Sequence, residues 1–173
     1  MASKVLLVQS DAKSRKLIAD FLTEIGFAVE EAKAGAEVMR KLHAERKRFH
    51  LLIYDFDLAH SDRVEMAVAV RASRQVIPVI VMNSAPSITA DRVLFEGPVE
   101  FVKKPLDLEQ LSSSAIRLLA RRCRRKHASQ TWHTCTTCSD WPTADYEERI
   151  VTPLRDLELC NECRLSLQQG LCA

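Results

Sequence analysis

The first 119 residues of the chain alternate short apolar runs with stretches that have the apolar spacing of a helix. The apolar runs fall at residues 5–8, 27–29, 51–54, 76–82 and 100–102, and the helical stretches fall at 17–25, 36–46, 64–71, 89–95 and 107–119. Strands that alternate with helices predict a parallel sheet with helices on both faces. Continuous apolar strands are typical of such a sheet, because both of its faces are buried. We therefore predict an α/β fold, a doubly wound five-stranded parallel sheet.

A change in composition divides the chain after residue 120. The apolar periodicity stops over residues 121–130, which contain a basic strip formed by Arg121, Arg122, Arg124, Arg125 and Lys126. All of the cysteines lie at or after Cys123. We predict a first domain over residues 1–120, a basic linker or helix end over 121–130, and a small cysteine-containing module over 131–173.

Two polar residues stand directly after or near the ends of predicted strands. Asp55 follows the strand at 51–54, and Lys104 follows the strand at 100–102. In doubly wound sheets the binding site lies at the carboxyl ends of the strands. Both side chains are therefore expected in one site.

Residues 3–120 resemble the receiver domain of bacterial response regulators. The resemblance rests on the segments 5–8, 51–55 and 78–82, and on the sequence Phe101-Val102-Lys103-Lys104-Pro105. It implies a flavodoxin-like receiver fold in which Asp55 is the phosphorylated aspartate and Lys104 contacts the phosphate. It also implies that Phe101, three residues before the lysine, rotates with activation.

Other pocket positions depart from the pattern of that family. The family has an acidic pair after the first strand that helps to bind Mg²⁺, and a serine or threonine after the fourth strand that bonds the phosphoryl group. This chain has Gln9 and Ser10 at the acidic pair, with Asp11 one residue later, and it has Asn83 at the serine or threonine, with Ser84 adjacent.

These departures predict a pseudo-receiver that serves as a binding scaffold. Mg²⁺ prefers anionic oxygen ligands, and phosphoryl transfer depends on the charge that it supplies. Asp11 and Asp57 are the remaining carboxylates that could replace the acidic pair, and their side chains start from different backbone positions. We expect impaired Mg²⁺ binding and an ion pair between Lys104 and Asp55, with normal phosphorylation of Asp55 as the alternative.

Four cysteines form two C-x-x-C pairs, Cys135 with Cys138 and Cys160 with Cys163. Each pair folds into a tight turn that directs two thiolates at one point, and two such turns complete a tetrahedral sulfur site. We predict a structural Zn²⁺ held by these four cysteines, with an iron–sulfur cluster as the alternative. Four protein ligands leave no open position for catalysis.

The module is too short to build a sufficient apolar core unaided, so the metal is expected to hold it folded. His133 is expected on the surface or beside the ligands, with replacement of one ligand as the alternative. Cys123 and Cys172 have no C-x-x-C partner and are expected to be spare thiols. The expected core consists of Trp132, Trp141, Ile150, Leu157 and Leu159.

The second cysteine pair, in the sequence Leu159-Cys160-Asn161-Glu162-Cys163, resembles GATA-type fingers, which bind DNA. Residues 131–173 contain three basic and seven acidic residues, a formal charge of −4. A DNA-reading finger needs lysine and arginine to neutralise phosphates. Nucleic-acid binding by the finger is therefore disfavoured, and its acidic face predicts a protein partner.

The basic strip has three interpretations. If the last helix continues to Lys126, the strip is the solvated basic end of that helix. The alternatives are contact with a nucleic-acid backbone and docking of the acidic finger of the same chain.

These observations predict a non-enzymatic signalling adaptor with a receiver-like domain and a zinc module, each binding a protein partner. The receiver resemblance implies that the partner surface is the face of the last strand and final helix, around Phe101, Lys104 and Leu108. The second prediction is a phosphorylation-dependent transcription regulator that binds DNA. The chain shows no signal peptide and no run of roughly 18 apolar residues, so we expect a cytoplasmic protein that does not bind membranes.

Overall fold

A computed structural model describes residues 2–43, 49–73, 77–84, 95, 97–151 and 157–169 of the chain. It divides into two compact units, Ala2–Leu119 and Ala120–Ala173, which we call the N-terminal unit and the C-terminal unit. None of the helices in the described ranges combines the length and the apolar character needed to cross a membrane.

The N-terminal unit contains a five-stranded parallel sheet with the order β2-β1-β3-β4-β5. The predicted fold class is therefore confirmed. The strand order reverses between β1 and β3, and binding sites in such sheets lie outside the carboxyl ends of the strands at this reversal. The strands are β1 (Lys4–Val8), β2 (Ala28–Ala32), β3 (Leu51–Asp55), β4 (Val79–Asn83) and β5 (Val99–Lys103).

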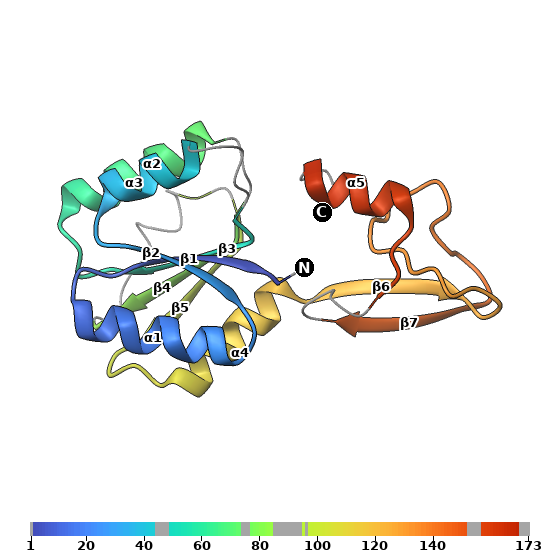
Figure 1. Ribbon diagram of the computed structural model, residues 1–173, viewed down its shortest axis with the longest axis horizontal. Helices are drawn as coiled ribbons and strands as arrows, with labels where there is room; N and C mark the ends of the chain where they lie inside the picture. The colour runs from blue at the N-terminus through green and yellow to red at the C-terminus, as the bar shows by residue number, and fades with distance from the viewer. Residues whose placement is uncertain are drawn as a thin grey trace. The chain divides into compact units, whose positions relative to one another are not determined.

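Helices cover both faces of this sheet (Figure 1). Helices α2 (Gly35–His43) and α3 (His60–Ala72) lie on one face, and α1 (Ala12–Glu24) and α4 (Leu108–Leu119) lie on the other. The helix predicted over residues 89–95 falls almost entirely outside the described residues. Asp107 stands at the start of α4 and accepts hydrogen bonds from the backbone N–H groups of Glu109 and Gln110.

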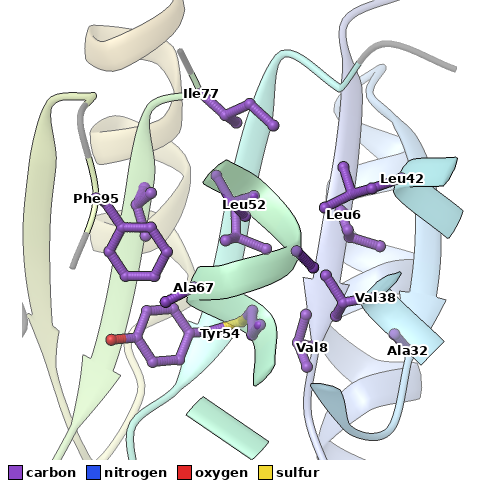
Figure 2. Packing of buried hydrophobic residues seen from close by; sticks show 14 of the residues in the cluster. Leu6, Val8, Ala32, Val38, Leu42, Leu52, Tyr54, Ala67, Ile77 and Phe95 are labelled. Atoms are coloured by element: carbon purple, nitrogen blue, oxygen red, sulfur yellow. The ribbon is translucent and has the colours of Figure 1, made fainter. Parts of the chain in front are cut away.

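Side chains of the central strands divide between two apolar cores, because successive residues of a strand point to opposite faces. Leu52 and Tyr54 of β3 join the core under α2 and α3, whereas Leu51 and Ile53 join the core under α1 and α4. Figure 2 shows Tyr54 beside Phe95, with ring centroids 5.7 Å apart. Every residue of β3 and β4 is buried, which explains why both segments are apolar up to their last residues, Asp55 and Asn83.

Gly35, the first residue of α2, lies against α3 with no room for a side chain. A Cβ atom built there would lie 2.5 Å from the carbonyl oxygen of Asp62 and 2.8 Å from the Cβ of Glu65. We expect Gly35→Ala to force α2 and α3 apart and to lower the free energy of unfolding by about 1–3 kcal/mol, the usual cost of overpacking. Urea denaturation measures this, with the exposed Ala36→Ser as control; an unchanged midpoint for Gly35→Ala would contradict the packing.

The C-terminal unit contains a two-stranded antiparallel ribbon, β6 (Arg121–Lys126) with β7 (Tyr146–Val151), and the helix α5 (Asn161–Gln169). Here the structure differs from the predicted helix end, because α4 stops at Leu119 and the basic strip is strand β6. Cys123, at the centre of β6, is fully buried, whereas Arg122 next to it is exposed. Burial thus alternates along this segment as it does in a strand, and the basic strip is not a continuation of the last helix.

The small core of this unit also differs from the prediction at one residue. Trp132 is buried, with 4% of its surface exposed, and Trp141 packs against the cysteine cluster. Ile150 is 71% exposed, because a two-stranded ribbon has one face that nothing in the described part of this unit covers. Leu157 is only half-buried.

Candidate functional site

The carboxyl ends of β1, β3 and β5 bring together Gln9, Asp55 and Lys104. Asp55 is buried, and the ammonium group of Lys104 lies 2.6 Å from each of its carboxylate oxygens. The same ammonium group lies 2.7 Å from Oδ2 of Asp57. One lysine therefore binds two carboxylates in this pocket.

These contacts determine the charges of the pocket. Burial alone would lower the pKa of Lys104, but hydrogen bonds to Asp55 and Asp57 outweigh it, so the pKa is raised above its ordinary value. The hydrogen bond from Lys104 lowers the pKa of Asp57, against a smaller opposing effect of burial, and a hydrogen bond from Ser84 adds to the lowering. Near neutral pH, Lys104 is charged and Asp57 is ionised.

Gln9 binds Asp55 through the nitrogen of its side-chain amide. Its Nε2 donates to Asp55 Oδ2 at 2.6 Å, while its Oε1 accepts from the backbone N–H of Asp11 at 3.1 Å. An exchange of the two amide atoms would set an oxygen against a carboxylate and an N–H group against an N–H group, so these partners fix the orientation. Gln9 stands at the first position of the family's acidic pair, and there it donates a hydrogen bond to the carboxylate of Asp55.

The other predicted pocket residues have different environments. Asp11 is the N-cap of α1, and its carboxylate accepts from the backbone N–H of Ser14 at 2.7 Å. Ser10 is exposed. Asn83 is buried, and its carbonyl oxygen accepts from the backbone N–H of Lys104. Phe101 is half-buried and packs against the core under α2 and α3.

Arg15, which was not expected among the pocket residues, is buried beside this pocket. Its Nη1 donates to the carbonyl oxygens of Gln9 and Ser10 at 2.6 and 3.1 Å, and its Nε pairs with Glu31 at 3.1 Å. Arg15 therefore holds the loop that carries Gln9. A signal was present, because Arg15 is spaced with the buried Ile18, Ala19 and Leu22 of α1.

A second site in the C-terminal unit combines His133, Cys138, Cys160 and Cys163. One possible ligand atom from each residue lies within 4.8 Å of the corresponding atom of the others. The Nδ1 of His133 lies 3.4 Å from the Sγ of Cys138, which lies 3.6 Å from the Sγ of Cys160. Burial raises the pKa of the Cys138 thiol to about 12. This Cys/His group has the composition of a metal site.

The structure brings together three of the four predicted ligand residues, Cys138, Cys160 and Cys163. The fourth, Cys135, is buried and disulfide-bonded. Cys123 carries a free thiol. His133, which we expected on the surface or beside the ligands, is the fourth member of the Cys/His group and is only 8% exposed.

The arginines of β6 pair with glutamates of β7. Arg124 lies opposite Glu148 and contacts it at 2.7 Å, and Arg125 lies opposite Glu147 and contacts it at 2.8 Å. The guanidinium group of Arg124 also lies 4.0 Å from the ring centroid of Tyr146. Two charges of the basic strip and two of the acidic segment therefore face each other across one ribbon.

The sequence model of the family described as "Response regulator receiver domain" matches residues 5–116, more than half of the chain. The chain belongs to the response-regulator receiver family. The match ends within α4, so it covers the Asp55 pocket and excludes the Cys/His group.

Two transcriptional regulatory proteins are similar to part of the chain. The transcriptional regulatory protein TctD of Salmonella typhimurium is 29% identical over 129 residues, which are 73% of this chain and 56% of that protein. The transcriptional regulatory protein ZraR of Klebsiella oxytoca is 27% identical over 117 residues, which are 67% of this chain and 26% of that protein. The matched part thus spans about a quarter to about half of these relatives.

Solved receiver structures share the fold. The chemotaxis protein CheY4 of Vibrio cholerae gives a TM-score of 0.60 at 24% identity and covers 69% of this chain and 100% of its own. The receiver domain of the sensor histidine kinase PA1611 of Pseudomonas aeruginosa, with a magnesium ion in its active site cleft, gives 0.55 at 20% identity, covering 68% and 98%. At these identities the likeness concerns the fold alone.

Proposed function

We propose that this protein is a non-enzymatic signalling adaptor, in which a pseudo-receiver domain and a zinc-stabilised module each bind a protein partner. The observation that carries the proposal is the hydrogen bond from the Gln9 amide to Asp55, together with the contact of Lys104 with both Asp55 and Asp57. The phosphoacceptor-like carboxylate is thus already satisfied by donors of the chain itself.

Electrostatics disfavour Mg²⁺ in this pocket. A magnesium ion needs anionic or carbonyl oxygens in nearly octahedral order. Asp55 and Asp57 supply carboxylates, but an ammonium group lies between them, and Gln9 turns its N–H group toward Asp55. Asp11 is occupied as a helix cap. A cation would have to displace Lys104 and overcome its charge.

Phosphate mimics test the pseudo-receiver. Incubation of the full chain with Mg²⁺ and beryllofluoride is expected to give no stoichiometric complex, because phosphoryl chemistry in this fold depends on the metal charge. Native mass spectrometry and calorimetry measure the complex. An adduct at one per chain that disappears in Asp55→Ala would overturn the proposal.

A matched variant tests whether the missing acidic pair is the reason for weak Mg²⁺ binding. Gln9→Asp combined with Ser10→Asp restores the family's acidic pair beside an unchanged Asp55. This variant is expected to bind Mg²⁺ measurably in calorimetry under conditions where the parent does not. Equal magnesium affinities of the two proteins would contradict the electrostatic explanation.

The proposed partner surface of the receiver is the face of β5 and α4 around Phe101, Lys104 and Leu108. Phe101 and Leu108 are half-buried and pack against the cores on opposite faces of the sheet, and Ile116 of α4 is 47% exposed. A single exposed apolar side chain is ordinary on a protein surface, so this surface is proposed from the resemblance to receiver domains. For the C-terminal unit, pairing of Glu147 and Glu148 with arginines leaves less acidic charge for a partner than the sequence count implies.

A phosphorylation-dependent transcription regulator is the second candidate, favoured by the named role of the TctD and ZraR relatives. An electrophoretic mobility shift at moderate salt separates the two candidates. Binding of duplex DNA by the full chain would support the second, whereas the adaptor is expected to give no shift. We propose a cytoplasmic location for either one.

A further inference from the structure

We infer that the zinc ligands of the C-terminal unit are His133, Cys138, Cys160 and Cys163, and that Cys135 lies outside the coordination shell. This inference rests on the proposal that the unit binds zinc. It changes the expected four-sulfur site into a site of three sulfurs and one nitrogen.

The distances within the group fit tetrahedral zinc. With a Zn–S bond of about 2.3 Å and a Zn–N bond of about 2.0 Å, the edges of the tetrahedron are about 3.8 Å between two sulfurs and about 3.5 Å between sulfur and nitrogen. The Cys138–Cys160 sulfur pair is separated by 3.6 Å, and the His133 Nδ1–Cys138 Sγ pair by 3.4 Å. These two separations are those of a tetrahedral site, and all four candidate ligand atoms lie within 4.8 Å of one another.

Backbone hydrogen bonds on two sides hold His133 at this place. His133 exchanges both backbone hydrogen bonds with Arg124 of β6, at 2.7 and 2.8 Å. The preceding residue, Trp132, donates to the carbonyl oxygen of Glu158 and accepts from the N–H group of Cys160. The segment that carries His133 is therefore tied directly to the segment that carries a cysteine ligand.

Neighbouring backbone N–H groups favour Cys160 and Cys163 as thiolates. The backbone N–H of Thr134 points at the sulfur of Cys163 at 3.4 Å, and that of Cys163 points at the sulfur of Cys160 at 3.2 Å. Donors of this kind orient and stabilise metal ligands. The sulfur of Cys135 instead lies 3.8 Å from the carbonyl oxygen of Cys163, and its disulfide removes it as a thiolate.

The charge of the site also favours an imidazole as the fourth ligand. Three thiolates with Zn²⁺ carry a net charge of −1, whereas four would carry −2. A carboxylate oxygen of Glu162 lies only 3.7 Å from the sulfur of Cys138. A less negative metal centre is repelled less by this neighbour.

Cobalt substitution in the full chain tests the ligand set. The experiment uses a reductant that keeps Cys135 available as a thiol, so that it can compete for the metal. The absorption of Co²⁺ is expected to have the sulfur charge-transfer intensity of three thiolates and to be the same in Cys135→Ser. His133→Ala is expected to weaken Co²⁺ and Zn²⁺ binding more than about 100-fold, beyond the cost of losing a neighbour of a ligand.

His133→Cys keeps the test decisive if the alanine variant fails to fold. It is expected to shift the cobalt spectrum to that of four thiolates. A four-thiolate spectrum in the parent that loses one thiolate in Cys135→Ser would overturn the ligand set while leaving a metal-binding module. Failure of the parent to bind any metal would overturn both the module and its ligands.

Discussion

A strong chelator is expected to unfold the C-terminal unit of the zinc-loaded protein while the N-terminal unit stays folded. A short unit with a small core depends on its metal, and zinc contributes about 10–16 kcal/mol to the folding of comparable modules. The two tryptophans of the chain, Trp132 and Trp141, both lie in this unit. Their fluorescence therefore reports this unfolding, while far-UV circular dichroism follows the helices of the other unit.

Cysteine variants provide the controls for that experiment. Cys160→Ser is expected to show the tryptophan emission of the chelated protein even with zinc present. Cys123→Ala removes a cysteine of the same unit that lies outside the Cys/His group, and it should keep the response to chelator. If the thermal transition seen in tryptophan emission were the same before and after chelation, the folding of the C-terminal unit would not depend on the metal.

Replacement of Lys104 by methionine is expected to lower the free energy of unfolding by about 2–4 kcal/mol. Removal of one partner from a buried ion pair leaves an uncompensated charge, at a typical cost of about 3–5 kcal/mol. The side chain of Lys104 is 24% exposed and that of Asp55 7%, so solvent reduces this cost. Denaturant unfolding followed by far-UV circular dichroism measures it.

The same pocket offers a matched control and a compensating variant. Lys103 precedes Lys104 in the chain and is exposed, so Lys103→Met should change stability by less than about 0.5 kcal/mol. Asp55→Asn added to Lys104→Met removes the uncompensated charge and should recover part of the loss. Strictly additive effects of these two changes would mean that the ion pair contributes nothing.

The spacing of residues decided the larger features of this protein. Alternation of apolar strands with amphipathic helices determined the parallel sheet, because each element must bury its apolar side. The position of Asp55 and Lys104 after two strands determined that they meet, since parallel strands end at the same edge. The absence of the acidic pair was equally visible in Gln9 and Ser10.

Hydrogen-bond partners that are distant in sequence decided the rest. Arginines every four residues fit a helix, yet opposite glutamates and a buried Cys123 make that segment a strand of a ribbon. The C-x-x-C spacing predicts Cys135 as the fourth ligand, and the structure instead groups His133 with the other three cysteines. That choice depends on the backbone bonds that tie His133 to β6 and Trp132 to Cys160, and such pairing exists only once the chain has folded.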